Sequence, residues 1–252
     1  MKKVLIAICF SVLGGVVSAS PASVATGEYP PYTGQNLESG GLVNGLVQKI
    51  ADKAEVDIEF EYLPWKRSLE LVRSGAHDAL SFWSELPDQS GLAMIGPVSV
   101  GSIVVFYRKD KPLPPFSKID EVTGVTIGVT LGYTYDQSFW DHVNTGAIKT
   151  EQAKDDLSNF RKLIAGRIDA FVVDELVGRS ILNENFSAAE IESLEHSQTS
   201  ISELAGYLMI SLNAPSGQEL ANKLQKAFEE MNETGEWEAQ RDALLQQMGL
   251  SE

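Results

Sequence analysis

Apolar positions along the chain change between two spacings, and each spacing predicts one kind of element. In residues 42–54 they recur every three or four positions, which predicts an amphipathic helix. In residues 57–62 they alternate with acidic side chains, the pattern of a half-buried strand. A helix is predicted from Pro64 to Gly75, and buried strands are predicted near 79–82 and 102–107. Strands alternating with helices predict an α/β fold with largely parallel strands and helices on both faces.

The same alternation continues after a proline-rich turn at residues 112–115. A strand at 125–129 ends in a glycine turn, Asp155 or Asp156 begins a helix that runs to Ile164, and 170–173 is again apolar. Residues 174–200 read as helical and polar, and 207–212 as a strand. Two further helices are predicted, from Ser216 and from about Glu236.

The two halves share the motif Gly-x-x-Asp-Ala, which starts at Gly75 and again at Gly166. In both places it follows a predicted helix and precedes a predicted buried strand. Glycine is common at helix ends in any case, so one copy means little. Two copies in matching surroundings indicate two equivalent α/β lobes instead of one long sheet.

The N-terminus has the features of a secretory signal. Lys2 and Lys3 precede an apolar run over residues 4–17, and small side chains at 17–19 predict cleavage after Ala19. The run is shorter than the roughly 20 residues of a membrane-spanning helix. The only cysteine, Cys9, lies inside it and is not placed for lipidation, so disulfides and thiol chemistry are not expected in the mature chain. Residues 1–19 are therefore predicted to be a signal peptide, and the mature protein to be periplasmic.

Charge narrows the choice of partners. The formal net charge is −15, and loss of the two signal lysines makes the mature chain more acidic still. Such a surface repels phosphate backbones and anionic lipids, so we expect no nucleic acid partner and no membrane insertion after cleavage. His77, His142 and His196 have no ligand-like spacing and the carboxylates do not cluster, so no metal and no cofactor is predicted.

Several segments together resemble the periplasmic solute-binding proteins of ABC importers, in the group that includes polar amino acid receptors (family 3). The matching segments are 25–32 (ATGEYPPY), 63–67 (LPWKR), 75–79 (GAHDA), 124–132 (GVTIGVTLG) and 166–174 (GRIDAFVVD). The resemblance spans nearly the whole mature chain and rests on the order and spacing of these segments.

This resemblance implies two lobes joined by two crossing strands, near residues 101–106 and 206–210, with a small ligand held between them. Lobe 1 would comprise residues 20–103 and 208–252, and lobe 2 residues 104–207. The protein would be a monomer that delivers its ligand to an inner-membrane ABC permease.

Four loops at the carboxyl ends of strands are candidates for ligand contact, because ligands of open α/β sheets bind there. The predicted ligand-binding residues are Tyr29, Tyr32, Trp65, Arg67, Trp83, Ser84, Tyr133, Thr134 and Asp174. Each has a structural alternative: the aromatic residues can be core packing, Arg67 can be solvated, and Asp174 can cap a helix. In the family, an aromatic residue of the loop that here holds Tyr29 and Tyr32 contacts the ligand's side chain, and an aspartate at the position of Asp174 contacts its ammonium group.

The sequence departs from the family in one respect. Amino acid receptors carry an arginine shortly after the third strand that grips the ligand's carboxylate, but no arginine lies between Trp83 and Tyr107. Arg67 could restore such a clamp from another direction. Otherwise, weak binding of glutamate and glutamine is expected, and an amine, a modified amino acid or an aromatic or sugar-like compound is the better candidate.

Two alternatives to transport stay open at this point. A sensory protein would present the same lobes to a membrane kinase, and sequence cannot separate the two roles. A dehydratase-like enzyme on this scaffold would use a cleft carboxylate such as Asp174, Glu175 or Glu28, but no nucleophile or metal motif accompanies them. We therefore predict no enzymatic activity and no catalytic residues.

Overall fold

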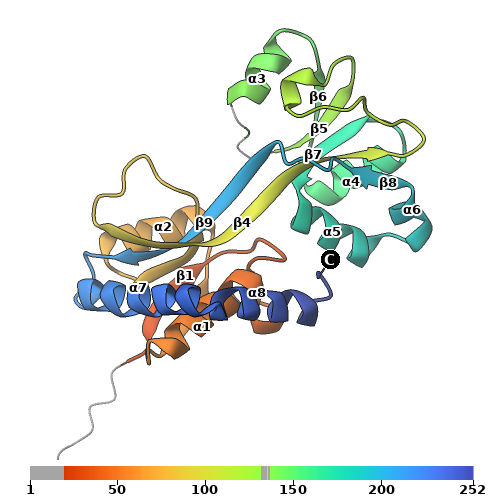
Figure 1. The fold of residues 1–252 in the computed structure, drawn as a ribbon. Helices are drawn as coiled ribbons and strands as arrows, with labels where there is room; N and C mark the ends of the chain where they lie inside the picture. The colour runs from red at the N-terminus through yellow and green to blue at the C-terminus, as the bar shows by residue number, and fades with distance from the viewer. Residues whose placement is uncertain (1–19, 132–134, 136, 252) are drawn as a thin grey trace, which may run out of the picture.

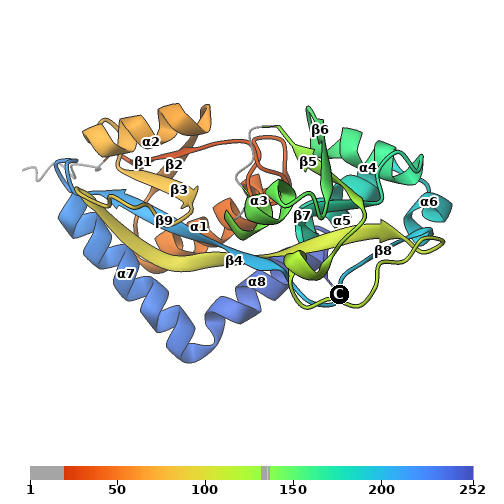
Figure 2. The same cartoon turned by 90° about the horizontal axis from the view of Figure 1, so that it is seen from above.

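The computed structural model describes residues 20–131, 135 and 137–251. The predicted signal peptide and two of the predicted ligand-binding residues, Tyr133 and Thr134, lie outside this range. The chain folds into two α/β lobes that two long strands connect, as Figures 1 and 2 show from two directions.

The first lobe is built on three parallel strands that alternate with helices. Its strands are β1 (Ala22–Thr26), β2 (Ile58–Tyr62) and β3 (Ala79–Trp83), and its helices are α1 (Leu42–Lys53), α2 (Trp65–Ser74), α7 (Gly217–Thr234) and α8 (Glu236–Gln247). Helix α2 packs on one face of the sheet through Val72 and Leu80. Helices α1 and α7 pack on the other face, where Leu46 and Leu224 join the largest apolar cluster.

The second lobe repeats this three-layer plan. Its strands are β5 (Thr126–Thr130), β6 (Lys149–Ala153), β7 (Ala170–Asp174) and β8 (Leu194–His196), and its helices are α3 (Gln137–Asn144), α4 (Asp156–Ile164), α5 (Glu175–Asn185) and α6 (Ala188–Glu192). Short 3-10 turns lie at Glu38–Gly40 and Ile119–Glu121. Phe139 of α3 packs on one face of this sheet, and Phe160 of α4 packs on the other, edge-on to Phe171 at a centroid distance of 5.0 Å.

The strands β4 (Leu92–Arg108) and β9 (Ser202–Ser211) run antiparallel from one lobe into the other. Their pairing gives a single sheet of order β2-β1-β3-β9-β4-β7-β5-β6, with β8 beside β4. Tyr207 of β9 pairs with Trp83 in the first lobe, whereas Ile103 of β4 pairs with Asp174 in the second. The crossing strands thus place the carboxyl ends of β3 and β7 on the two sides of the space between the lobes. The residue at which each lobe ends stays a prediction.

The repeated Gly-x-x-Asp-Ala motif makes the same bonds in both lobes. Gly75 and Gly166 have φ values of 77° and 70°, a left-handed conformation that glycine adopts without a Cβ penalty. Asp78 accepts the backbone N–H of Ser23 on the neighbouring strand at 2.8 Å, and Asp169 accepts that of Thr126 at 2.9 Å. The aspartate therefore ties the start of each strand to its neighbour, which explains the motif in structural terms.

The candidate ligand-binding cleft

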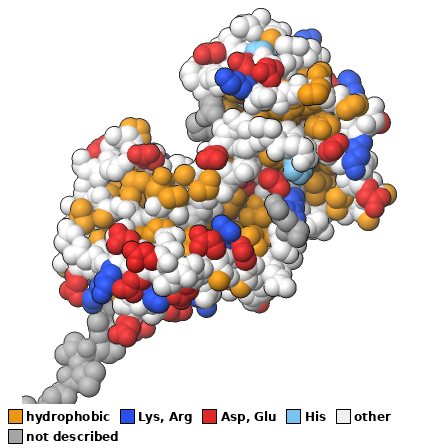
Figure 3. All heavy atoms as spheres, in the orientation of Figure 1, with side chains coloured by type: hydrophobic (Ala, Val, Ile, Leu, Met, Phe, Trp, Pro, Cys, Tyr) orange, Lys and Arg blue, Asp and Glu red, His pale blue; other side chains and the backbone are white. Residues whose placement is uncertain are grey.

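A cavity of about 350 Å³ lies between the lobes at the crossing strands, where the molecular surface in Figure 3 is notched. Its apolar lining comes from β4, β7, β9, the segment before β9 and the 3-10 turn that starts at Ile119. Tyr29, Tyr135 and Phe139 add aromatic rings. The polar lining side chains are Asp174, Ser138, Ser202 and Glu203. None of the described lining residues is Lys or Arg, and the sequence of residues 132–136 contains neither.

Asp174 is the most buried charge in this lining, with 2% of its surface exposed. It is the last residue of β7 and the N-cap of α5, where Oδ1 accepts the backbone N–H of Val177 at 3.0 Å. The hydroxyl of Tyr32, from the loop after β1, donates to both carboxylate oxygens at 2.9 Å. Asp174 is therefore held by its own helix and by the opposite lobe.

The surroundings of Asp174 shift the acidity of the groups around it. Burial raises the pKa of Asp174 to about 6, although the hydrogen bonds from Val177 and Tyr32 act in the opposite direction. Burial, with the nearby Asp174 carboxylate as the second cause, also holds the pKa values of Tyr29 and Tyr32 well above their usual range. Both tyrosines therefore remain neutral hydrogen-bond donors at physiological pH.

Aromatic side chains form a continuous stack on the first lobe. Tyr32 is stacked with Tyr29 at 5.5 Å and with Phe82 at 5.7 Å, with interplanar angles of 12° and 7°. Trp65 lies edge-on to Phe82 at 6.4 Å and to Trp83 at 5.8 Å. Each ring pair contributes about 0.5–1.5 kcal/mol beyond area burial, so the stack stabilises the position of these side chains.

Two glycines on the crossing strands make room for these side chains. A Cβ atom at Gly101 of β4 would overlap Oδ2 of Asp174, and one at Gly206 of β9 would overlap the ring of Phe82. The crossing strands can approach the cleft side chains this closely only because both positions lack a side chain.

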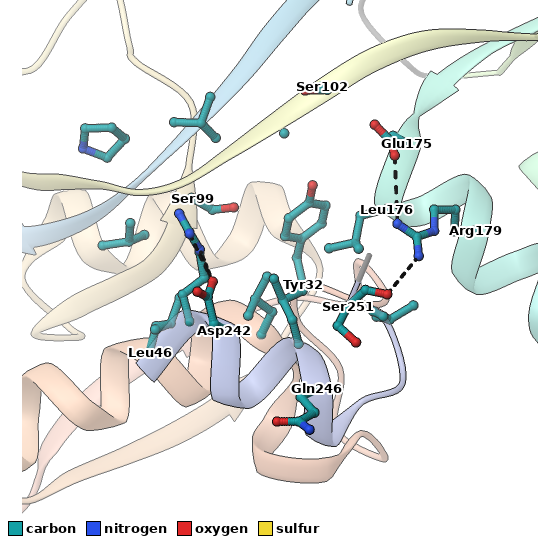
Figure 4. Close-up of a pocket in the computed structure, with 18 of the residues that line it drawn as sticks. Tyr32, Leu46, Ser99, Ser102, Glu175, Leu176, Arg179, Asp242, Gln246 and Ser251 are labelled. Atoms are coloured by element: carbon teal, nitrogen blue, oxygen red, sulfur yellow. Dashed lines mark hydrogen bonds and ion pairs between the residues drawn. The ribbon is translucent and has the colours of Figure 1, made fainter. Parts of the chain in front are cut away.

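A second cavity, of about 770 Å³, lies behind the cleft and is shown in Figure 4. Helix α8 and the following residues line one side, and Glu175, Leu176 and Arg179 of α5 line the other. The cleft is lined by α3 instead, and α3 and α8 lie on opposite sides of β4 and β9 in Figure 1. We call this cavity the back groove. Arg179 spans it by donating to the carbonyl oxygen of Ser251 at 3.2 Å.

Comparisons with known proteins place this geometry in a family. The sequence pattern of the bacterial extracellular solute-binding proteins, family 3, matches residues 23–246. The chain belongs to this family.

Two other comparisons describe relatives of this family 3 protein. The L-cystine-binding protein TcyJ of Escherichia coli strain K12 is 23% identical over 162 residues, which cover 63% of this chain and 60% of TcyJ. The match thus spans less than two thirds of the curated relative.

Solved structures share the two-lobed fold. A histidine kinase sensor domain similar to periplasmic binding proteins gives a TM-score of 0.67 at 21% identity, covering 89% of this chain and 96% of that one. An ancestral arginine-binding protein bound to arginine gives 0.63 at 21% identity, with 90% and 97% coverage. The GluR0 ligand-binding core with L-glutamate gives 0.67 at 15% identity, with 90% and 99% coverage. At these identities the likeness shows the fold alone.

The predicted ligand-binding residues of this family 3 protein fall into three groups. Tyr29 and Asp174 line the cleft cavity, and Tyr32 lines the back groove while bonding Asp174. Trp65 and Trp83 extend the aromatic stack without lining either cavity.

Arg67 and Ser84 form the third group, which lies away from both cavities. Arg67 lies exposed in the first turn of α2, and Ser84 lies exposed after β3. Neither residue lines either cavity, so nothing in this arrangement supports Arg67 as a replacement carboxylate clamp.

Sequence reasoning missed the part of the cleft that the crossing strands and α3 supply. Ile103 lines the cavity from β4. Ser202 and Leu204 line it because β9 begins at Ser202, earlier than its apolar run predicts. Phe139 reaches the cavity from α3, a helix that the sequence reading did not single out. The aromatic run at residues 133–140 was the available signal.

Two further findings concern the described part of the chain. No helix there is long and apolar enough to cross a membrane. Within the same residues, no group of three or more His, Cys, Asp or Glu side chains is arranged to hold a metal ion.

Proposed function

We propose that this protein is a periplasmic receptor that captures a small molecule bearing an ammonium group between its lobes and delivers it to an inner-membrane ABC permease. The observation that carries the proposal is the buried carboxylate of Asp174 in a cavity whose described lining has no basic side chain. Membership of the solute-binding family supplies the receptor role.

The energetics of burial favour a cationic ligand. An ionised carboxylate removed from water is costly unless a cation or several hydrogen bonds compensate it. Asp174 has hydrogen bonds, yet burial still raises its pKa to about 6, so these hydrogen bonds compensate the charge only in part. An ammonium group that entered the cavity would supply the missing countercharge and lower that pKa.

The other lining residues of the cavity indicate the chemistry and the size of the rest of the ligand. Tyr29, Tyr135 and Phe139 offer flat apolar surfaces, and Ser138 and Ser202 offer hydroxyl groups. A volume of about 350 Å³ is at the small end of the range for ligand pockets, roughly 300–1,000 Å³. An amine with a short apolar or hydroxylated body fits this lining better than an amino acid with a second carboxylate.

A sensory role is the second candidate. It is supported by the shared fold with a histidine kinase sensor domain. In that case the same closed form would be presented to a kinase instead of a permease, and ligand chemistry would be unchanged. A protein that only binds returns its ligand unaltered, so chromatography of ligand incubated with excess protein separates both receptor roles from an enzyme.

The test is a thermal-shift screen of the mature protein at neutral pH against primary amines, standard amino acids and neutral analogues. A ligand at 100 times its Kd adds about 2.7 kcal/mol to the free energy of unfolding, which is easily measured. We expect amines to raise the melting temperature and glutamate and glutamine to have little effect. Native mass spectrometry of protein purified without added ligand should find an amine bound.

The matched variant is Asp174→Asn, which keeps the cap of α5 and the bond from Tyr32 but removes the charge. Amine binding should weaken by about tenfold or more, since a charge-assisted hydrogen bond is roughly twice as strong as a neutral one. A strong shift with glutamate that Asp174→Asn leaves unchanged would refute the proposed ligand class.

A further inference from the structure

The Tyr32 hydroxyl is placed symmetrically on the carboxylate of Asp174. It lies 2.9 Å from Oδ1 and 2.9 Å from Oδ2. A donor at equal distances stands in front of the open edge between the two oxygens. That edge is the one a guanidinium group needs for a paired, two-bond contact with a carboxylate.

Tyr32 is held firmly in that position. Its ring is 3% exposed and is stacked against Tyr29 and Phe82. Its backbone carbonyl accepts the N–H of Val43 in α1 at 2.8 Å. Moving the hydroxyl aside would therefore disturb the aromatic stack as well as its hydrogen bond to Asp174, while the backbone bond keeps the residue itself in place.

The remaining capacity of the carboxylate is small. An ionised carboxylate offers about four acceptor positions. Three protein donors already bond this one: the Tyr32 hydroxyl, which is shared between the two oxygens, and the backbone N–H groups of Leu176 and Val177. While Tyr32 stays in place, the edge between the two oxygens is thus occupied, and a ligand cannot bond both oxygens through it.

The two common organic cations respond differently to this limit. An ammonium group is a compact point charge with separate donors, so it can give one hydrogen to Asp174 and direct the others elsewhere. A guanidinium group is a planar fork whose preferred contact uses both oxygens at once. We propose that Tyr32 is a specificity-determining residue that makes the cleft select ammonium ligands over guanidinium ligands of the same body. This inference rests on the proposed function and narrows its ligand class.

The experiment compares matched probes on matched variants. Isothermal titration at neutral pH would measure the Kd values of phenethylamine and phenethylguanidine, and of butylamine and butylguanidine. These probes are cations at this pH and differ within each pair only in the charged group. The variants are wild type, Tyr32→Phe, Asp174→Asn and Tyr62→Phe. The last removes a tyrosine hydroxyl that bonds Asn44 in the first lobe, away from the cleft.

Wild type and Tyr62→Phe should bind each amine about tenfold more tightly than its guanidine, the ratio for one charge-assisted bond. Tyr32→Phe keeps the ring and frees the open edge of the carboxylate, so the ratio should fall toward one because guanidine binding improves. A structural effect of the mutation would change both members of a pair together and leave the ratio unchanged.

Different outcomes would contradict the selectivity proposed for Tyr32 and the ammonium site proposed at Asp174. If wild type binds guanidines as tightly as amines, or if Tyr32→Phe leaves the ratio unaltered, Tyr32 does not select the ligand and only this inference fails. If no probe binds, or if Asp174→Asn binds the probes as well as wild type, the proposed ammonium site itself is wrong and the inference falls with it.

Discussion

Gly101 of β4 faces the carboxylate of Asp174 so closely that a Cβ atom at position 101 would overlap Oδ2 and stand 2.7 Å from the hydroxyl oxygen of Tyr32. The hydrogen-bonded pair Tyr32 and Asp174, which joins the two lobes, therefore requires a glycine at position 101 of the connecting strand β4.

The first prediction concerns Gly101→Ala. The added methyl group should separate Tyr32 from Asp174, lower the free energy of unfolding by about 1–3 kcal/mol and weaken amine binding. Chemical denaturation and titration with an amine would measure both effects. Val100→Ala is the control on the same strand, because Val100 is 52% exposed and its truncation should cost no more than about 0.5 kcal/mol. Normal stability and normal binding of Gly101→Ala would show that the added methyl group leaves the Asp174 carboxylate in place, and would contradict this prediction.

The second prediction concerns how the stability of the protein without added ligand depends on pH. Because burial raises the pKa of Asp174 to about 6, the folded state binds this proton more tightly than the unfolded state. The resulting stability is present below the ordinary carboxyl pKa and is lost as pH rises through about 6. The contribution is at most about 3 kcal/mol, from two pKa units at 1.36 kcal/mol each.

Denaturation at several pH values should therefore show that Asp174→Asn gains stability relative to wild type as the pH rises from about 4 to about 7. The added free energy of a bound amine should be greatest above pH 6, where the carboxylate is ionised. Parallel pH profiles for the two proteins would contradict the assignment.

The third prediction concerns closure of the lobes. A ligand that contacts both lobes shifts the population toward the closed form only through its greater affinity for that form. Small-angle scattering should give a smaller radius of gyration with saturating amine than without it. Asp174→Asn at the same amine concentration is the control for incomplete binding. An unchanged profile for saturated wild type would exclude a hinge mechanism.

The fourth prediction concerns the back groove. Closing the cleft turns the lobes about β4 and β9, so the groove on the other side should widen and the bond from Arg179 to Ser251 should break. Arg179→Ala should therefore favour closure and raise ligand affinity by about two- to tenfold, the equivalent of one hydrogen bond.

Arg241→Ala is the matched control for this effect. Arg241 lines the same groove but pairs with its neighbour Asp242 on α8 at 3.0 Å, so its loss does not disconnect the lobes. Titration of both variants with the same amine measures the difference. A fall in affinity for Arg179→Ala, or equal changes in the two variants, would contradict this view of the groove.

Much of the fold could be predicted from hydrophobic spacing. The helix predicted at residues 42–54 is α1, the Pro64–Gly75 helix is α2, and Asp155 caps α4. The two-lobed arrangement is confirmed, and its repeated Gly-x-x-Asp-Ala motif has the same bonds in each lobe. These features are local, so a single sequence contains the information that determines them.

The cleft was harder to predict because its lining depends on pairing between distant segments. The strand prediction at 102–107 gave only part of β4, which starts at Leu92 and includes Gly101. The predicted importance of Asp174 did not reveal that Tyr32 would bond it across the lobes. Trp65, Trp83 and Arg67 were plausible cleft residues by type, but the direction of their side chains is set by tertiary packing. The roles predicted for them stay untested.

Helix α5 connects the two cavities directly. Asp174 caps it in the cleft, while Glu175, Leu176 and Arg179 of the same helix line the back groove. Arg179 lies five residues from the carboxylate, a rise of about 7.5 Å along the helix axis. A rigid element of this length carries any displacement at the bound charge to the outer surface. A membrane partner that contacts only the back groove could thus distinguish the ligand-bound protein from the ligand-free protein without contacting the ligand.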